Sequence, residues 1–166
     1  MLNEAEFIIN KLELTPHPEG GYYKEIYRSN EIINFQDSDR RIGGSRNFST
    51  SIYFLLAGEQ ISHFHRLTSD EIWHFYKGSP LLIHLIEGDK YSSVEIGNNI
   101  ESEVPQLVIR KGIWFAAELM DKTGFSLVGC TVSPGFDFRD FELAEKDELI
   151  KIIPSQKKLI EKFTIK

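Results

Sequence analysis

Short apolar runs alternate with polar residues through the middle of the chain and predict β-strands there. The runs are rich in β-branched and aromatic residues, and glycines separate most of them at a spacing that suits hairpin turns. The predicted strands span residues 22–28, 48–56, 60–65, 71–77, 81–87, 91–96, 105–110, 113–118 and 125–133. Many short strands with glycine turns are typical of an antiparallel sandwich or barrel, including the jelly roll. The polar stretch from residue 29 to about residue 47 is predicted to be an irregular loop.

The two ends of the chain have helical patterns instead. Residues 3–12 predict a short amphipathic helix, with Asn3 as its N-cap and Glu6 completing a capping box. Residues 144–163 predict a helical tail that a proline interrupts, with Ser155 capping the last short helix. The predicted architecture is therefore all-β with short terminal helices.

Composition and charge narrow the possible partners. The 166 residues are 41% hydrophobic and 27% charged, as in globular proteins, and no internal repeat divides them. We therefore expect one domain over residues 1–166, with the barrel at about 20–142. A net charge of −6 argues against nucleic acid or an anionic membrane as a partner. With one cysteine, no signal peptide and no apolar run of ~20 residues, the expected location is the cytoplasm.

Candidate chemistry is concentrated between residues 58 and 78. His63 and His65 are two residues apart, so on a regular strand both rings lie on the same face of the sheet. Glu71 begins the next strand, and antiparallel pairing would bring it near both histidines. Two histidines and a carboxylate can bind Fe, Mn, Ni or Zn and leave positions open for substrate. The alternative is that the histidines only form hydrogen bonds inside the barrel.

The same alternation predicts which neighbours line a pocket. Trp73 and Phe75 share the face of the predicted glutamate ligand, while His74 points to the other face. On the first strand, Glu25 and Tyr27 are two residues apart and are predicted to share the face of the barrel interior. The alternative for this strand is an exposed edge of the sheet.

The histidine-containing stretch also resembles a known motif. It contains, in order, Gly58, His63, His65, Glu71 and Gly78. This order resembles the first motif of the cupin superfamily, although one gap is a residue short and another a residue long. At Phe115, metal-binding cupins supply a further ligand, and phenylalanine cannot coordinate. The resemblance leaves two alternatives, which are a metal held by three ligands and a metal-free pocket.

Three longer motifs resemble the cupin-5 (DUF985) family. They lie at residues 14–29, 64–74 and 132–142, in the order in which that family has them. The resemblance implies a double-stranded β-helix, or jelly-roll, barrel and a homodimer, but no activity, because the family has none assigned. His17 and Glu19 fall in the first motif, where the resemblance favours a place at the edge of the pocket or of a dimer contact. A simple turn before the first strand is the alternative.

Two classes of function are compatible with these residues. In the first, the protein is an enzyme with acid–base chemistry, isomerase-like or epimerase-like, on a small polar molecule such as a sugar derivative or an organic acid. The candidate catalytic residues are His65, Glu71 and Tyr53, and the candidate ligand-binding residues are Glu25, Tyr27, Trp73, Phe75, Phe115 and His17. A metal-dependent oxygenase or isomerase using His63, His65 and Glu71 is a variant of this class. In the second class, the barrel binds or senses a small ligand without turning it over.

Overall fold

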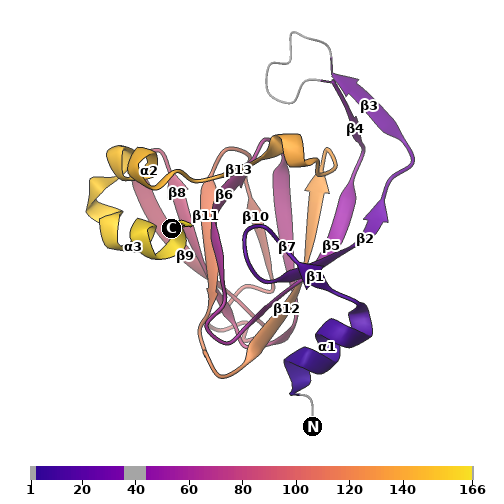
Figure 1. Ribbon diagram of the computed structural model, residues 1–166, viewed down its shortest axis with the longest axis horizontal. Coiled ribbons are helices and arrows are strands. Elements are labelled where there is room, and N and C mark those ends of the chain that lie inside the picture. The colour runs from indigo at the N-terminus through magenta and orange to yellow at the C-terminus, as the bar shows by residue number, and fades with distance from the viewer. Residues whose placement is uncertain (1–2, 36–43, 166) are drawn as a thin grey trace.

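Two antiparallel β-sheets face each other in the computed structural model, which describes residues 3–35 and 44–165 (Figure 1). The first sheet has six strands, in the order β1 (Thr15–Pro16), β2 (Tyr22–Arg28), β5 (Thr50–Ala57), β12 (Phe125–Ser133), β7 (Asp70–Gly78) and β10 (Gln106–Ile109). The second has five, in the order β13 (Phe141–Leu143), β6 (Ile61–Leu67), β11 (Trp114–Leu119), β8 (Leu81–Glu87) and β9 (Lys90–Ile96). This arrangement confirms the expected all-β jelly-roll barrel.

The predicted strands are all present, with ends that differ by a few residues at most. The predicted loop at residues 29–47 is the main correction, because it contains two paired strands, β3 (Ile32–Phe35) and β4 (Gly44–Asn47). The short apolar run in β3 was outweighed in the sequence by the polar residues that follow it. Figure 1 shows this pair projecting beyond the barrel. Residues 36–43, which complete the predicted loop, lie outside the described part of the chain.

Helices pack on part of the outer face of each sheet. Helix α1 (Glu4–Leu12) begins at Asn3 with the predicted capping box and packs on the first sheet. Helices α2 (Lys146–Ile152) and α3 (Lys157–Phe163), joined by the 3₁₀ turn η2 (Pro154–Gln156), pack on the second. Ser155 lies inside that turn, and Gln156 is the N-cap of α3, so the predicted serine cap is wrong. No helix within residues 3–35 and 44–165 has the length and apolarity needed to cross a membrane.

The space between the sheets is filled with apolar side chains at one end and is open at the other. Phe54, Trp73, Ile83, Phe115 and Val128 belong to one buried cluster that draws on strands of both sheets. Phe54 and Trp73 also line a pocket, so they form the boundary between packed core and open space. Burying such large side chains stabilises the barrel by ~1.5–3 kcal/mol for each of them. The packed core thus provides a rigid floor for the pocket.

Candidate functional site

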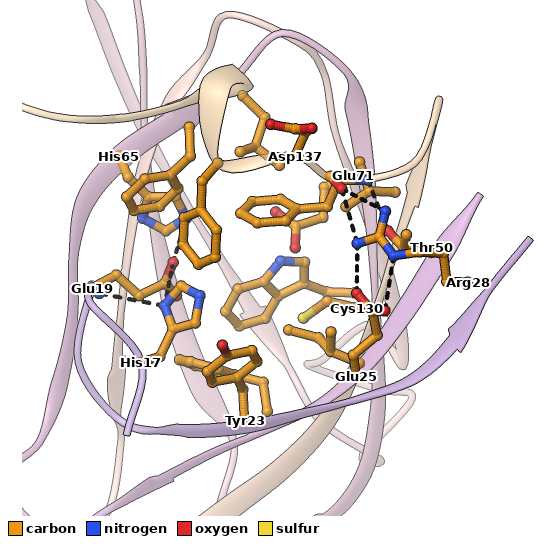
Figure 2. Close-up of a pocket in the computed structure, with 18 residues that line it drawn as sticks. His17, Glu19, Tyr23, Glu25, Arg28, Thr50, His65, Glu71, Cys130 and Asp137 are labelled. Carbon is orange, nitrogen blue, oxygen red and sulfur yellow. Dashed lines mark hydrogen bonds and ion pairs between the residues drawn. The ribbon is translucent and has the colours of Figure 1, made fainter. Parts of the chain in front are cut away.

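A pocket of about 520 Å³ lies inside the barrel. This volume falls in the range of ~300–1,000 Å³ that is usual for small-molecule sites. The polar side chains that line it are His17, Glu19, Glu25, Arg28, Thr50, His65, Glu71 and Asp137, and the aromatic ones are Tyr23, Phe54, Trp73, Phe136, Phe138 and Phe141. Figure 2 shows His17, Glu19 and His65 on one side of the pocket, and Glu25 and Arg28 on the opposite side.

The loop before β2 carries His17 and Glu19 into the pocket because two glycines let it pack tightly. Gly20 has a φ of 109°, and a Cβ there would lie 2.1 Å from the backbone oxygen of Ile61. Only glycine adopts such a backbone at this distance without strain. The carbonyl of Glu19 then accepts hydrogen bonds from the backbone N–H of His63 at 2.8 Å and from its Nδ1 at 2.7 Å. Gly20 therefore lets the loop pack on strand β6, while Gly21 packs against Leu55 of β5.

Glu19 and His65 share a proton. His65 Nδ1 lies 2.7 Å from the carbonyl oxygen of His63, which can only accept, so Nδ1 carries the ring hydrogen. The other nitrogen, Nε2, lies 3.1 Å from Glu19 Oε2. Burial raises the pKa of Glu19 well above its usual value, and the nearby Glu71 adds to this effect. Burial also lowers the pKa of His65 to about 3. The proton therefore stays on Glu19, and its O–H donates a hydrogen bond to His65 Nε2.

His17 presents a hydrogen-bond donor to the pocket. Its Nδ1 accepts a hydrogen bond from the backbone N–H of Glu19 at 3.3 Å, so the ring hydrogen is on Nε2. Burial lowers the pKa of His17 to about 4, which keeps the ring neutral near pH 7. No described residue accepts a hydrogen bond from Nε2. This N–H is available to a ligand.

Trp73 presents a second unpaired donor to the pocket, and Glu71 presents an unpaired acceptor. Their side chains lie two residues apart on the same face of β7, and they are 7% and 1% exposed. In the described part of the chain, neither Glu71 Oε2 nor Trp73 Nε1 has a hydrogen-bond partner. Burial raises the pKa of Glu71 to about 7, partly offset by the nearby Trp73 indole and Cys130 thiol. A buried carboxyl with a pKa near neutrality is typical of functional sites.

On the opposite side of the pocket, Arg28 is fully engaged. Its Nε and Nη2 bind the two oxygens of Glu25 at 2.9 and 2.7 Å. Nη1 donates to Asn47 Oδ1 at 2.8 Å, and Nη1 and Nη2 both donate to the carbonyl of Phe136 at 3.2 and 3.1 Å. These contacts use all five N–H groups of the guanidinium. Arg28 therefore joins β2 to the aromatic rim of the pocket.

That rim is the segment 136–141, which includes the 3₁₀ turn η1 (Phe138–Asp140). The backbone N–H of Phe136 donates to Thr50 Oγ1 at 2.8 Å. Asp140 is buried and accepts from Arg46 Nε at 2.5 Å and from Nη2 at 2.8 Å. These contacts tie the rim to β5 and to the β3–β4 pair. Three phenylalanines of the rim can then close one side of the pocket.

A register shift in β6 separates the two histidines that were predicted to share a face. Phe115 of β11 pairs with His65, whereas Ala117 pairs with Ser62, so β6 has an extra residue between these pairs. Such a bulge breaks the alternation of faces. Ser62 and His65 both contact the carboxyl of Glu19, at 2.9 and 3.1 Å. His63 does not line the pocket and instead anchors the Glu19 backbone.

The predicted metal site is therefore not formed. Within the described residues, no group of three or more His, Cys, Asp or Glu side chains is placed to hold a metal ion. Phe115 does not line the pocket; it is 1% exposed, and its ring lies with its centroid 4.0 Å from that of His65. An apolar ring thus occupies the space beside the imidazole where a further ligand would stand. The side chains present do not fit a metal, and we derive no chemistry through one.

A second bulge corrects the assignment of β2. Its pairing with β5 shifts between Glu25 and Tyr27, which leaves Ile26 as the extra residue. Glu25 lines the pocket as predicted, but Tyr27 turns outward and is 54% exposed. Arg28 takes the inward position instead. The sequence contains no signal for this shift, because both neighbours of the bulge are ordinary strand residues.

The remaining predicted site residues have mixed positions. His17, His65, Glu71 and Trp73 line the pocket, whereas Phe75 packs against the core cluster and does not. Tyr53 lies on the outer face of the first sheet, where its ring contacts Tyr76, with centroids 6.1 Å apart. By alternation, its neighbours Ile52 and Phe54 are the residues of β5 that face the pocket. Tyr53 therefore cannot contact a ligand there.

The other two histidines are outside the pocket. His74 lies on the outer face, where it contacts Gln106 and Thr131. His84 lies under α3 and contacts Tyr91 at 2.9 Å and Glu118 at 3.3 Å. Glu118 also accepts hydrogen bonds from Lys122 and Lys162. It therefore forms ion pairs outside the pocket and does not act as a ligand in the barrel.

Several pocket residues were not predicted from sequence. Tyr23, Arg28, Thr50, Asp137 and the rim phenylalanines line the pocket, and Glu19 was assigned only to its edge. The rim could have been found from the spacing of Phe136, Phe138 and Phe141, which places several aromatic rings close together just after the last long strand. The roles of Glu19 and Arg28 depend on contacts across the barrel that local patterns do not contain.

Comparison with known proteins gives consistent matches over most of the chain. Residues 6–144 match the family described as "Cupin superfamily (DUF985)". The uncharacterised protein YML079W of Saccharomyces cerevisiae is 30% identical over 161 residues, which cover 90% of this chain and 80% of the yeast protein. A hypothetical protein from Leishmania major is similar with a TM-score of 0.87 and 38% identity, covering 99% of this chain and 100% of that one. Protein SO0799 from Shewanella oneidensis is similar with a TM-score of 0.85 and 40% identity, covering 99% of each chain. The chain belongs to the cupin-5 (DUF985) family of the cupin superfamily.

Proposed function

We propose that the protein binds a small polar molecule in the barrel pocket and moves a proton on it, as isomerases and epimerases do. The observation that carries this proposal is Glu71, a buried carboxyl with an unpartnered oxygen in a pocket of ligand size. Its pKa of about 7 lets the carboxylate take up a proton near neutral pH. Glu19 and His65 hold the second proton of the pocket and are the matching acid.

In the proposed reaction, Glu71 accepts a proton from a C–H group beside a carbonyl of the ligand. The electron pair of that bond stays on the ligand as an enolate. The proton held by Glu19 and His65 is then delivered to the ligand, which restores a neutral product. His17 Nε2–H and Trp73 Nε1–H are free to donate to the oxygen on which charge develops.

Deuterium exchange tests this proposal directly. Sugars and hydroxy acids that carry a carbonyl, or can open to one, are incubated with the protein in heavy water and followed by proton NMR. We expect loss of one C–H signal with the native protein and at least ~100-fold slower exchange with Glu71→Gln. Glu101→Gln, in an exposed turn, is the control and should exchange normally. Binding without exchange for every compound would instead support a pocket that only binds or senses its ligand, as its aromatic lining also allows.

We also propose that the protein is a homodimer that uses the outer face of the first sheet. Tyr27, Tyr76 and Val108 point outward from this sheet and are 54%, 51% and 44% exposed. Apolar groups exposed together on one sheet are typical of association surfaces. Light scattering after size exclusion should give twice the chain mass of 19.1 kDa, and Val108→Lys should reduce it toward the monomer. A monomeric native protein would contradict the proposal.

A further inference from the structure

The residues that line the pocket include no positively charged group free to bind an anion. Among the described residues that line it, Arg28 is the single lysine or arginine. Its five N–H groups are all used by Glu25, Asn47 and the carbonyl of Phe136. A phosphate or carboxylate would have to displace the Glu25 carboxylate, which holds Arg28 Nε and Nη2 in a bidentate pair, to reach the guanidinium.

The histidines do not supply a positive charge either. His17 and His65 are buried deeply enough to hold their pKa values at about 4 and about 3, so both rings are neutral near pH 7. The carboxyl groups of Glu19, Glu25, Glu71 and Asp137 also line the pocket and would repel an anion wherever they are ionised. An anionic ligand would therefore lose its hydration without gaining a partner of opposite charge.

The unpaired polar atoms match a hydroxyl group instead. Glu71 Oε2 needs a donor, whereas Trp73 Nε1–H and His17 Nε2–H need an acceptor. A hydroxyl both donates and accepts, so adjacent hydroxyls can satisfy all three atoms. An ammonium group could satisfy Glu71 but has no lone pair for the two N–H donors. Mixed donors and acceptors thus favour an uncharged ligand over a cation.

The aromatic lining fits the rest of such a ligand. Tyr23, Phe54 and Trp73 come from three strands of the first sheet, and Phe136, Phe138 and Phe141 come from the rim. Rings on two sides of a pocket can pack on the C–H faces of a saturated ring while its hydroxyls meet the polar atoms. We propose that the pocket binds a neutral sugar, an uncharged polyhydroxylated compound that can open to a carbonyl form, and excludes its phosphorylated and carboxylated forms. This inference rests on the proposed function and specifies its ligand class.

Calorimetric titration of the full chain with a matched panel tests the inference. The panel pairs neutral sugars (glucose, galactose and xylose) with sugar phosphates, aldonic acids and amino sugars. At least one neutral member is expected to bind at least ~10-fold more tightly than its phosphate, acid and amine counterparts. Trp73→Phe, which keeps a ring but removes the N–H, should weaken this binding by ~10-fold. Trp114→Phe, outside the pocket, is the matched control and should bind normally.

A gain-of-function variant gives an independent readout. Glu25→Gln removes the carboxylate that occupies Arg28 Nε and Nη2. The released N–H groups should raise the affinity for the phosphorylated sugar by ~10-fold relative to that for the neutral sugar. An unchanged phosphate affinity would mean that Arg28 does not control charge selection.

The inference is overturned if a phosphate, an acid or an amine binds the native protein as tightly as the neutral compound. It is also overturned if no neutral member binds. Binding of a charged compound that is lost in Glu71→Gln would leave the proposed function standing while this inference fails. Failure of every compound in the panel, and of a wider library, to bind in a Glu71-dependent way would remove both.

Discussion

Four ionisable side chains of the pocket have pKa values displaced toward the neutral form, and burial is the main cause for each. It raises the pKa of Glu19 and Glu71 and lowers that of His17 and His65. The two kinds of shift affect stability with opposite sign. Neutral buried histidines are favourable near pH 7, and this contribution is lost as the pH falls from 6.5 toward 3 for His65. Buried carboxyls, by contrast, make the protein less stable as the pH rises.

Glu71→Gln is expected to remove the loss of stability that Glu71 causes as the pH rises. The folded pKa of about 7 lies above the usual 4.5, so the folded state binds the proton more tightly than the unfolded state does. Stability then falls as the pH rises from 4.5 to 7, by ~3 kcal/mol in total. The variant should gain stability relative to the native protein by ~2–3 kcal/mol between about pH 5 and about pH 8.

Urea unfolding at these two pH values measures the effect. Glu101→Gln, which removes an exposed carboxylate in a turn, is the control. If Glu71→Gln differed from the native protein by the same amount at both pH values, the Glu71 carboxyl would have an ordinary pKa, and its proposed role as a base near neutrality would lose its support.

At the scale of single elements, the position of strands was predictable, but the direction of side chains was not. Glycine turns and β-branched runs act locally, so all nine predicted strands are present. The face of the sheet on which a side chain lies follows from alternation only while the strand register is continuous. The bulges in β6 and β2 each insert one residue, and each moved one predicted pocket residue, His63 and Tyr27, out of the interior. Bulges depend on the partner strand, which the local sequence does not specify.

The site was predictable to a similar extent. His65, Glu71 and Trp73 were found because they lie on regular parts of β6 and β7. Glu19 was assigned only to an edge, because its contact with His65 requires the loop to fold back over 46 residues of sequence (65 − 19). The predicted metal ligands looked convincing as a set of residue types, yet the backbone does not bring them together. Residue type can therefore predict possible chemistry, whereas register decides which side chains meet.

The buried pair Arg46–Asp140 is expected to control how well the rim is held. The two residues are 4% and 7% exposed and connect β4 to η1 with two hydrogen bonds. Asp140→Asn replaces the buried carboxylate that accepts two hydrogen bonds from Arg46 with a neutral amide, which should cost ~3 kcal/mol of unfolding free energy. Ligand binding should weaken as well, because Asp140 lies within the rim, between Phe138 and Phe141.

Chemical denaturation gives the cost, and Arg139→Gln is the control in the same turn. Arg139 pairs with Asp137 at 2.7 Å, but its side chain is 64% exposed, so its loss should change stability by less than ~1 kcal/mol. Equal effects of the two substitutions would show that burial of the Arg46–Asp140 pair does not matter to the rim.

At the scale of the whole molecule, the barrel and the helical tail share side chains from the same strands. Trp114 and Phe115 are neighbours on β11, yet Trp114 packs in the cluster with α2 and α3 while Phe115 packs between the sheets. Lys162 of α3 also binds Glu118 of β11 at 2.7 Å. Loss of the tail would expose the outer face of this strand, so we propose that residues 1–166 fold as one domain.

The two tryptophans make this proposal testable, because each reports on one side of β11. Trp114→Phe leaves Trp73 as the sole reporter of the pocket, and Trp73→Phe leaves Trp114 as the sole reporter of the contact with the tail. For each variant, fluorescence and far-UV circular dichroism should give coincident urea unfolding curves. If the fluorescence of Trp114 changed at a lower urea concentration than the circular dichroism, the tail would detach before the barrel unfolds. In that case the helices would unfold separately from the barrel, and the pocket would depend only on the two sheets and the rim.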